Sequence, residues 1–334
     1  MIETLREVSM IKKDTARSES NRQILRMWTI LLVVALAAIA PRAVFGQAKV
    51  GTTGAQFLEL GVSARSMAMA ESFVAVADDI SAVYYNPAGL TSLFGWESQF
   101  TYIQMPADVG YYFASVGSPV EDVGGVVAFS AYSLNSGWMK ETDYYRSTED
   151  GTGREFTWGD LALAASYGRY LTDRFSVGIT LKFISETAHD YSASGWSADV
   201  GTLYNTGFRG FKIGMVITNF GPDLRMIDQS YPLPINFKFG GAINAIESND
   251  NVLTLSAEGW HPSDNLEKYN VGGEWTYKDR FSLRAGGRIN YDISGLTLGG
   301  GVKMPFGEER EIRVDYAWQD FGILTQVHRF TLGI

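Results

Sequence analysis

Residues that could carry out catalysis or hold a metal are few and scattered in this sequence. The three histidines, His189, His261 and His328, lie far apart in the chain and lack metal-ligand spacing. The chain has no cysteine, which excludes thiol catalysis and cysteine-bound zinc. No phosphate-binding loop, dinucleotide fingerprint or Gly-x-Ser-x-Gly motif is present. We therefore expect no enzymatic activity, metal or cofactor; an outer-membrane hydrolase is the alternative, because serine and histidine are present.

A second set of candidate residues lies nearer the amino end and consists of Asp78, Asp79 and the run Asn86-Pro87-Ala88-Gly89. Asn86 is a good turn former, Pro87 stiffens the turn that follows, and Gly89 allows a positive φ. Adjacent aspartates are typical of helix ends and turns rather than of acid/base pairs. We interpret these residues as structural, with direct ligand contact as the alternative.

Most of the chain consists of short blocks in which apolar and polar residues alternate. Phe175, Val177 and Ile179 fall on one face of such a block, and Ser176 and Thr180 fall on the other. A period of two places one face of a strand in an apolar medium and the other in a polar one. Blocks of this kind recur from about residue 95 onward, and we count about fourteen, an even number as in bacterial barrels.

Block length and the placement of aromatic residues distinguish a membrane barrel from a soluble β-sandwich. The blocks are about nine to eleven residues long, which a tilted strand needs to cross a bilayer, whereas ordinary strands average about five or six. Aromatic residues gather at block ends, as in interfacial girdles. Charged residues make up only 19% of the chain, yet the mean hydropathy is -0.05. We predict a closed all-β membrane barrel of about fourteen antiparallel strands, with a large soluble sandwich as the alternative.

Residues 1–46 have the pattern of a secretory signal peptide. Their apolar run, residues 27–40, follows several arginines and is too short to span a bilayer comfortably. We expect cleavage before Gln47, with translation starting at Met1, Met10 or Met27; an amino-terminal anchor is the alternative. The mature protein would be more acidic than the whole chain, whose net charge is -9, so we expect no nucleic-acid binding.

Residues 47–94 lack strand alternation. The stretch from Val62 to about Ala77 is rich in alanine and methionine and predicts a helix, and a second short helical stretch ends near Asn86. Because about fourteen strands enclose more space than wall side chains can fill, we predict that residues 47–94 form a partly helical hatch in the lumen and that residues 95–334 form the barrel. A periplasmic arm is the alternative for residues 47–94.

The stretch from Gly61 to Leu90 carries a family resemblance. It reads GVSARSMAMAESFVAVADDISAVYYNPAGL. This segment resembles the opening signature of the PorV/PorQ family, which belongs with the FadL-type outer-membrane barrels. The resemblance implies a fourteen-stranded wall closed by an amino-terminal hatch with an Asn-Pro-Ala element. It also implies a location in the outer membrane of a Gram-negative-type bacterium, in contact with outer-membrane lipid.

Two residue-level expectations concern the hatch. Such proteins often have glycine after the methionines, whereas this chain has Ala70 and Glu71, so a tight bend there is in doubt and the helix is expected to continue. Arg65 is expected to pair with a lumen carboxylate, of which the strand pattern offers Asp199, Glu274 and Asp315. Inward-facing Lys182, Lys238, Arg284 and Arg288 would give the hatch further partners.

Two classes of function remain. The PorV/PorQ resemblance implies a non-enzymatic component of type IX-like protein export or surface attachment, with secretion-machinery proteins or secreted cargo as partners. The FadL resemblance implies uptake of hydrophobic small molecules such as long-chain fatty acids, with the molecule, or a detergent, held in the lumen. A contiguous apolar pocket between Met67, Met69, Phe73 and the wall would favour uptake. A sealed polar lumen with an extended aromatic loop around Trp138, Tyr144 and Tyr145 would favour a protein partner.

Overall fold

The fold is described from a computed structural model. It describes residues 50–145, 151–293, 295–307 and 310–334. The predicted signal peptide, residues 1–46, lies outside the described residues. Within the described ranges, no helix is long and apolar enough to cross a membrane.

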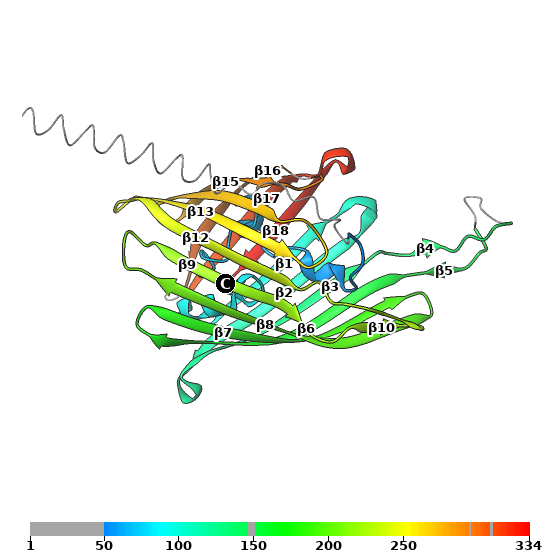
Figure 1. Cartoon of the computed structure of the whole chain (residues 1–334). Helices are drawn as coiled ribbons and strands as arrows, with labels where there is room; N and C mark the ends of the chain where they lie inside the picture. Colours follow the sequence, from blue (N-terminus) through cyan, green and yellow to red (C-terminus); the bar gives the residue numbers. More distant parts are fainter. Residues whose placement is uncertain (1–49, 146–150, 294, 308–309) are drawn as a thin grey trace, which may run out of the picture. The chain divides into compact units, whose positions relative to one another are not determined.

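Fourteen antiparallel strands close into one barrel, which confirms the predicted architecture (Figure 1). Strand β1 pairs with β2 on one side and with β18 on the other, so the first and last strands complete the wall. In chain order, the wall strands are β1 (Glu97–Gln104), β2 (Gly110–Val120), β3 (Gly125–Asn135), β6 (Trp158–Thr172), β7 (Phe175–Ala188), β8 (Tyr191–Asn205), β9 (Lys212–Phe220), β12 (Asn236–Glu247), β13 (Asn251–Pro262), β14 (Lys268–Tyr277), β15 (Phe281–Ile289), β16 (Leu296–Phe306), β17 (Arg310–Asp320) and β18 (Gln326–Gly333).

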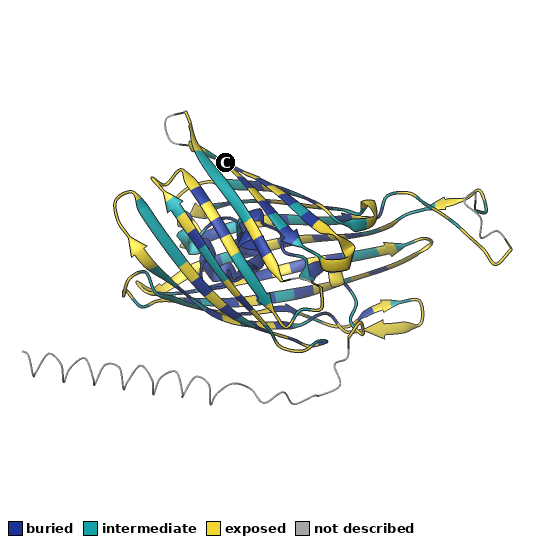
Figure 2. Cartoon of the chain, turned by 90° about the horizontal axis from the view of Figure 1, so that it is seen from above, coloured by how far each residue is buried: buried dark blue, intermediate teal, exposed yellow. Residues whose placement is uncertain are grey.

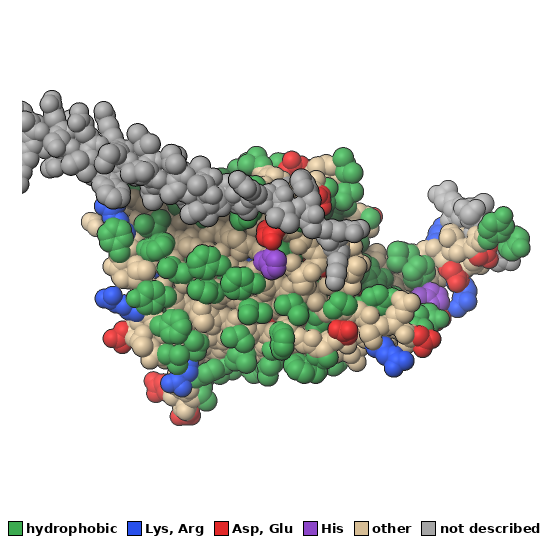
Figure 3. All heavy atoms as spheres, viewed as in Figure 1, with side chains coloured by type: hydrophobic (Ala, Val, Ile, Leu, Met, Phe, Trp, Pro, Cys, Tyr) green, Lys and Arg blue, Asp and Glu red, His purple; other side chains and the backbone are tan. Residues whose placement is uncertain are grey.

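The alternating pattern separates the two faces of the wall. On β7, Leu181 and Phe183 are more than half exposed, whereas Lys182 between them is buried. Figure 2 shows this alternation along the strands, and Figure 3 shows apolar side chains spread over the outer surface. Because the outer face is apolar and each of the fourteen barrel strands has two neighbours, the wall leaves no strand edge unpaired and suits a lipid environment.

The two ends of the barrel differ in the length of their connections. One end, called here the short-turn end, has tight links between strands, and Ile334 lies there. The opposite end, called here the long-loop end, has the links 136–157 and 221–235 as its longest. Each long link contains a small hairpin: β4 (Met139–Lys140) pairs with β5 (Glu155–Phe156), and β10 (Leu224–Met226) pairs with β11 (Gln229–Tyr231).

The hatch, residues 50–94 in the structure, lies inside the barrel, and Figure 2 shows its buried residues within the ring of strands. It contains the 3-10 helix η1 (Gln56–Glu59), helices α2 (Ala64–Ala68) and α3 (Ala82–Tyr85), and the 3-10 helix η2 (Pro87–Ser92). It starts at the long-loop end, where the Gly54 N–H donates to the Pro232 carbonyl at 2.9 Å. It ends at the short-turn end, where β1 begins. The predicted lumenal hatch is therefore confirmed, and the periplasmic arm is excluded.

The prediction of a long helix from Val62 to about Ala77 is wrong. Helix α2 covers only Ala64–Ala68, and the chain then turns at Ala70 and Glu71, whose φ angles are 56° and 61°. Non-glycine residues at positive φ cost roughly 1–2 kcal/mol each, so other contacts must hold the bend. The Glu71 carboxylate pairs with Arg288 of β15, and the Ala70 N–H donates to Thr297 Oγ1 at 3.0 Å. Contacts with the wall thus hold Ala70 and Glu71 in a bend that was expected to require glycine.

Candidate functional site

The Asn86 side chain joins the hatch to itself and to the wall. Its Nδ2 donates to the carbonyls of Val74 at 2.8 Å and Thr202 at 3.0 Å, and its Oδ1 accepts from the Ala88 N–H at 3.2 Å. Asn86 is fully buried and caps η2, which Pro87 opens. Every hydrogen-bonding group of its amide is used within the protein, and this arrangement agrees with the structural interpretation of the motif.

Gly89 serves a different purpose from the one expected. Its φ is not positive, but a Cβ atom at this position would lie 2.1 Å from the Ala77 carbonyl oxygen. Real side chains do not approach a backbone atom that closely. Glycine is therefore required because two segments of the hatch touch at this point.

Inward-facing glycines of the wall receive the backbone of the hatch. A Cβ atom at Gly178 of β7 would lie 2.2 Å from the carbonyl carbon of Pro87, and one at Gly201 of β8 would lie 2.1 Å from Asn86 Oδ1. Similar close approaches to the hatch occur at Gly168, Gly214, Gly272, Gly286 and Gly299. Glycine in a strand commonly marks a close approach of another backbone. The glycine positions thus form a seat shaped for the hatch.

Arg65 is the centre of an ionic network between the hatch and the wall. It pairs with Asp78 at 2.6 Å and Asp79 at 2.9 Å on the hatch, and with Glu274 of β14 at 2.8 Å. The predicted pairing of Arg65 with Glu274 is therefore confirmed. Asp199 pairs instead with Lys182 at 2.7 Å. The network faces the short-turn end and closes the lumen there with charged groups from both parts of the chain.

Arg313 and Arg284 extend this network around the wall. Arg313 of β17 pairs with Asp79 at 3.0 Å, and Arg284 of β15 pairs with Glu274 and with Asp315. Burial by itself would raise the pKa of Asp79, but the guanidinium groups of Arg313 and Arg65 outweigh this and hold the pKa well below its usual range. Asp79 therefore stays ionised at neutral pH, and the network keeps its charge.

One side of the lumen near the long-loop end is apolar, which the strand pattern did not indicate. Inward-facing Ile103, Phe113, Tyr132 and Ile184 form one buried cluster with hatch side chains. The hatch contributes Phe57, Leu58, Met69, Phe73, Tyr84 and Tyr85 to it. Phe113 and Tyr132 contact each other with ring centroids 5.0 Å apart. An apolar inner lining therefore exists on this side of the wall, and hatch side chains pack against it.

The three residues predicted to line a ligand pocket do not form one pocket in this closed state. Met69 and Phe73 belong to the apolar cluster described above, whereas Met67 packs in a second cluster with Ala64, Ala68 and Ala317. All three side chains are fully buried. Of the inward cations expected to contact the hatch, Arg288 binds Glu71, whereas Lys182 is bound to wall residues.

The predicted partner-binding loop stands apart from the hatch. Trp138, Tyr144 and Tyr145 lie in the link that carries the β4–β5 hairpin and are 76%, 91% and 90% exposed. Figure 1 shows this hairpin extending away from the barrel at the long-loop end. The structure therefore separates the sequence-predicted residues into a buried hatch group and an exposed aromatic loop.

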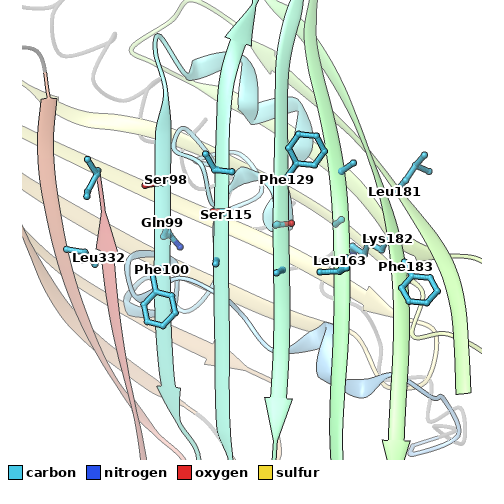
Figure 4. A pocket seen from close by; sticks show the side chains of 17 residues that line it. Ser98, Gln99, Phe100, Ser115, Phe129, Leu163, Leu181, Lys182, Phe183 and Leu332 are labelled. Atoms are coloured by element: carbon cyan, nitrogen blue, oxygen red, sulfur yellow. The ribbon is translucent and has the colours of Figure 1, made fainter. Parts of the chain in front are cut away.

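Two hollows lie outside the packed hatch. A cavity of about 1270 Å³ opens at the short-turn end, with the Arg65 network as its floor and Lys212, Lys278 and Arg310 near its rim. A second hollow of about 990 Å³ lies on the outer wall, and Figure 4 shows Phe100, Phe129 and Phe183 around it. The side chains around this second hollow are mostly apolar and face the lipid side, as a lipid-contacting surface requires.

The described residues contain no cluster of three or more side chains able to hold a metal. Each histidine has a separate partner: His189 lies 3.0 Å from Asp190, His261 lies 3.3 Å from Glu267, and His328 bonds the Tyr316 hydroxyl at 2.8 Å.

Comparison with known proteins identifies the fold but no family. No protein-family model and no curated protein matches the chain. The CymD monoaromatic hydrocarbon channel has a similar structure, with a TM-score of 0.55 and 12% identity over 82% of this chain and 96% of that one. The chain has the fold of FadL-like outer-membrane barrels.

Two toluene transporters support the same assignment. TbuX of Ralstonia pickettii gives a TM-score of 0.55 with 12% identity over 82% of this chain and 97% of its own. TodX of Pseudomonas putida gives 0.51 with 12% identity over 80% and 95%. Identities this low establish the fold alone, and the resemblance to PorV/PorQ proteins stays a prediction.

Proposed function

We propose that this protein is an outer-membrane channel for hydrophobic small molecules. The observation that carries the proposal is the apolar inner lining on one side of the lumen near the long-loop end, formed by wall residues such as Ile103, Phe113 and Ile184. The lumen of an ordinary porin is polar because water fills it. An apolar lining instead favours a hydrophobic ligand once the hatch side chains that fill it move aside.

The lead segment of the hatch, residues 50–60, is the part whose movement would uncover this lining. It carries Phe57 and Leu58, which are buried in the apolar cluster. Polar contacts hold it at the long-loop end: Gly54 binds the Pro232 carbonyl, the Ala55 N–H donates to Glu186, and Thr53 donates to Asp264. Each of these bonds contributes about 0.5–1.5 kcal/mol, or somewhat more where a carboxylate accepts, so the segment can be displaced without unfolding the wall.

The comparisons support the same proposal. The similar structures are a monoaromatic hydrocarbon channel and two toluene transporters, so barrels of this fold handle hydrophobic compounds. They favour uptake over the protein-export function that the PorV/PorQ resemblance implies.

A reversible tether of the lead segment tests the proposal. A Cβ atom placed on Gly54 would lie 3.5 Å from the Cβ of Tyr231 in β11, which is within the range of a disulfide. The chain has no native cysteine, so Gly54→Cys combined with Tyr231→Cys introduces a single crosslink. We expect uptake of a radiolabelled long-chain fatty acid, or of toluene, to fall to background in oxidised cells and to recover with dithiothreitol.

The single variants Gly54→Cys and Tyr231→Cys are the controls and should transport normally in both redox states. Equal uptake by cells with and without the protein, for both compounds, would show that it is not a channel for hydrophobic molecules. Full uptake by the crosslinked protein would show instead that the lead segment does not gate it.

Docking of a protein at the cell surface, for export or attachment, is the second candidate function. The exposed aromatic loop with Trp138, Tyr144 and Tyr145 favours it, because large exposed aromatic side chains are common at protein interfaces. The segment that resembles the PorV/PorQ signature does not separate the two functions, because its residues seat and seal the hatch. Replacing the three aromatic residues by serine should remove a stable partner and leave fatty-acid uptake unchanged. Unchanged partner recovery would exclude this candidate.

A further inference from the structure

Two carboxylates at the long-loop end of the lumen have no cation opposite them. Asp160, near the start of β6, and Glu186, near the end of β7, are direct cross-strand neighbours. Within the described part of the chain, neither makes an ion pair. Buried Asp199, by contrast, pairs with Lys182, and buried Asp315 pairs with Arg284. Buried Glu258 also makes no ion pair among the described residues, but its Oε2 accepts the N–H groups of Phe73 and Val74. Asp160 and Glu186 therefore differ from the ion-paired carboxylates Asp199 and Asp315.

The Asp160 side chain is also short of hydrogen bonds. Asp160 is only 3% exposed; the Trp158 side chain bonds its carboxylate, but its Oδ1 makes no hydrogen bond to any described residue. Glu186 is half-buried, and its Oε1 accepts the Ala55 N–H at 2.9 Å. Its Oε2 faces the lead segment, 3.6 Å from a Cβ placed on Gly54. Carboxylate oxygen without a partner in the protein is thus present on the strand next to the lead segment of the hatch.

This arrangement is unfavourable unless a further group is bound. Like charges directly opposite each other on neighbouring strands repel, and a buried carboxylate oxygen without a partner loses its hydration without compensation. A hard divalent cation prefers carboxylate oxygens and removes both penalties at once. A site supplied by only two carboxylates completes its coordination with water and binds weakly.

We propose that Asp160 and Glu186 bind a divalent cation of the calcium type. The cation links β6 to β7 and fixes the orientation of the Glu186 carboxylate. Because Glu186 Oε1 accepts the Ala55 N–H, the bound cation also stabilises the position of the lead segment. With two carboxylates, the dissociation constant is expected at about 10⁻⁴–10⁻³ M, as in extracellular calcium modules. The inference is independent of the compound that the barrel transports.

Terbium luminescence tests the binding directly. Tb³⁺ accepts the same oxygen ligands as Ca²⁺ and emits when a nearby tryptophan transfers energy to it, and Trp158 lies two residues before Asp160 on the same strand. The full chain, purified in detergent and stripped with EDTA, should give a saturable signal that Ca²⁺ displaces. Asp160→Asn and Glu186→Gln should each weaken binding at least about tenfold because each removes one of the two anionic ligands. The control Asp190→Asn, which removes an exposed carboxylate just after β7, should bind as the wild type does.

Thermal unfolding distinguishes a bound cation from a merely structural pair. In EDTA, Asp160→Asn should melt at or above the wild-type temperature because the repulsion is gone, and Ca²⁺ should raise the melting temperature of the wild type only. Glu186→Gln provides the same comparison if Asp160→Asn does not fold. The proposal is overturned if Ca²⁺ leaves the wild-type melting temperature unchanged, or if Tb³⁺ binds wild type and variant equally. The proposal is also overturned if the wild-type melting temperature rises at acidic pH but not with Ca²⁺. Asp160 and Glu186 would then be stabilised by a shared proton rather than by a cation.

Discussion

Arg65 shows how one residue can hold two separately formed parts of the protein together. Its guanidinium contacts three carboxylates, two from the hatch and one from β14, and its side chain is only 12% exposed. A planar group with several fixed donors can bridge carboxylates in this way, whereas lysine offers a single charged point. The closure of the short-turn end therefore depends strongly on this residue.

Replacing Arg65 should loosen the hatch. Arg65→Ala removes the cation that Asp79 and Glu274 share. Because Asp79 keeps Arg313 and Glu274 keeps Arg284, we expect a cost below the about 3–5 kcal/mol of leaving a buried charge unpaired. We expect higher ion conductance in planar bilayers and greater sensitivity of cells to large antibiotics, with Arg65→Lys intermediate. Arg154→Ala, at an arginine whose side chain is 70% exposed, is the control and should behave as the wild type. Wild-type conductance and resistance in Arg65→Ala would contradict this role.

The hatch and the strands are matched as elements by backbone proximity as well as by charge. Wall glycines such as Gly178 and Gly201 leave room for the backbone and side chain of the Asn86–Pro87 turn. The Asn86 side chain also donates to the Thr202 carbonyl of β8. The hatch is therefore positioned by the wall over several strands, and short helices such as α2 and α3 need little intrinsic stability of their own.

Adding one methyl group to this seat should displace the hatch without breaking the wall. A Cβ at position 178 would meet the Pro87 and Ala88 backbone at 2.2 and 2.4 Å, so Gly178→Ala should cost about 1–3 kcal/mol. The expected result is earlier thermal unfolding and faster proteolysis within the hatch. Gly259→Ala is a matched control on β13, because the nearest atoms to its Cβ are 3.9 Å away. Equal stability of the two variants would show that the glycine seat is not required.

At the scale of the whole molecule, the two ends of the described chain lie at opposite ends of the barrel. The lead segment is bound at the long-loop end through Gly54 and Pro232, whereas Ile334 bonds Ser98 at the short-turn end. In outer-membrane barrels the longer loops face the cell exterior. We therefore expect the hatch to cross the lumen from the outer side to the inner side before the first strand begins.

This direction can be tested by labelling with a membrane-impermeant maleimide, because the chain has no native cysteine. Val50→Cys replaces a residue that is 62% exposed and should react in intact cells. Phe94→Cys replaces a residue that is 98% exposed near the short-turn end and should react only after permeabilisation. The reverse pattern of labelling would show that the barrel is inserted in the opposite orientation.

The sequence alone determined the barrel, the strand faces and the division into hatch and wall. These follow from local rules: a period of two sets which side chains share a face, and the loss of that period marks residues 47–94 as something other than wall. The turn-forming role of Asn86 also follows from its own side chain and its neighbours. Such features depend on residues that are close together in the chain.

The tertiary structure decided which distant residues meet. Glu274 rather than Asp199 reaches Arg65, Ala70 and Glu71 bend because β15 and β16 hold them, and Asp160 faces Glu186 because of the register of β6 and β7. The apolar lining likewise arises only where inward residues of several strands converge at one end. Register and barrel closure bring together positions hundreds of residues apart, and no local pattern encodes that distance.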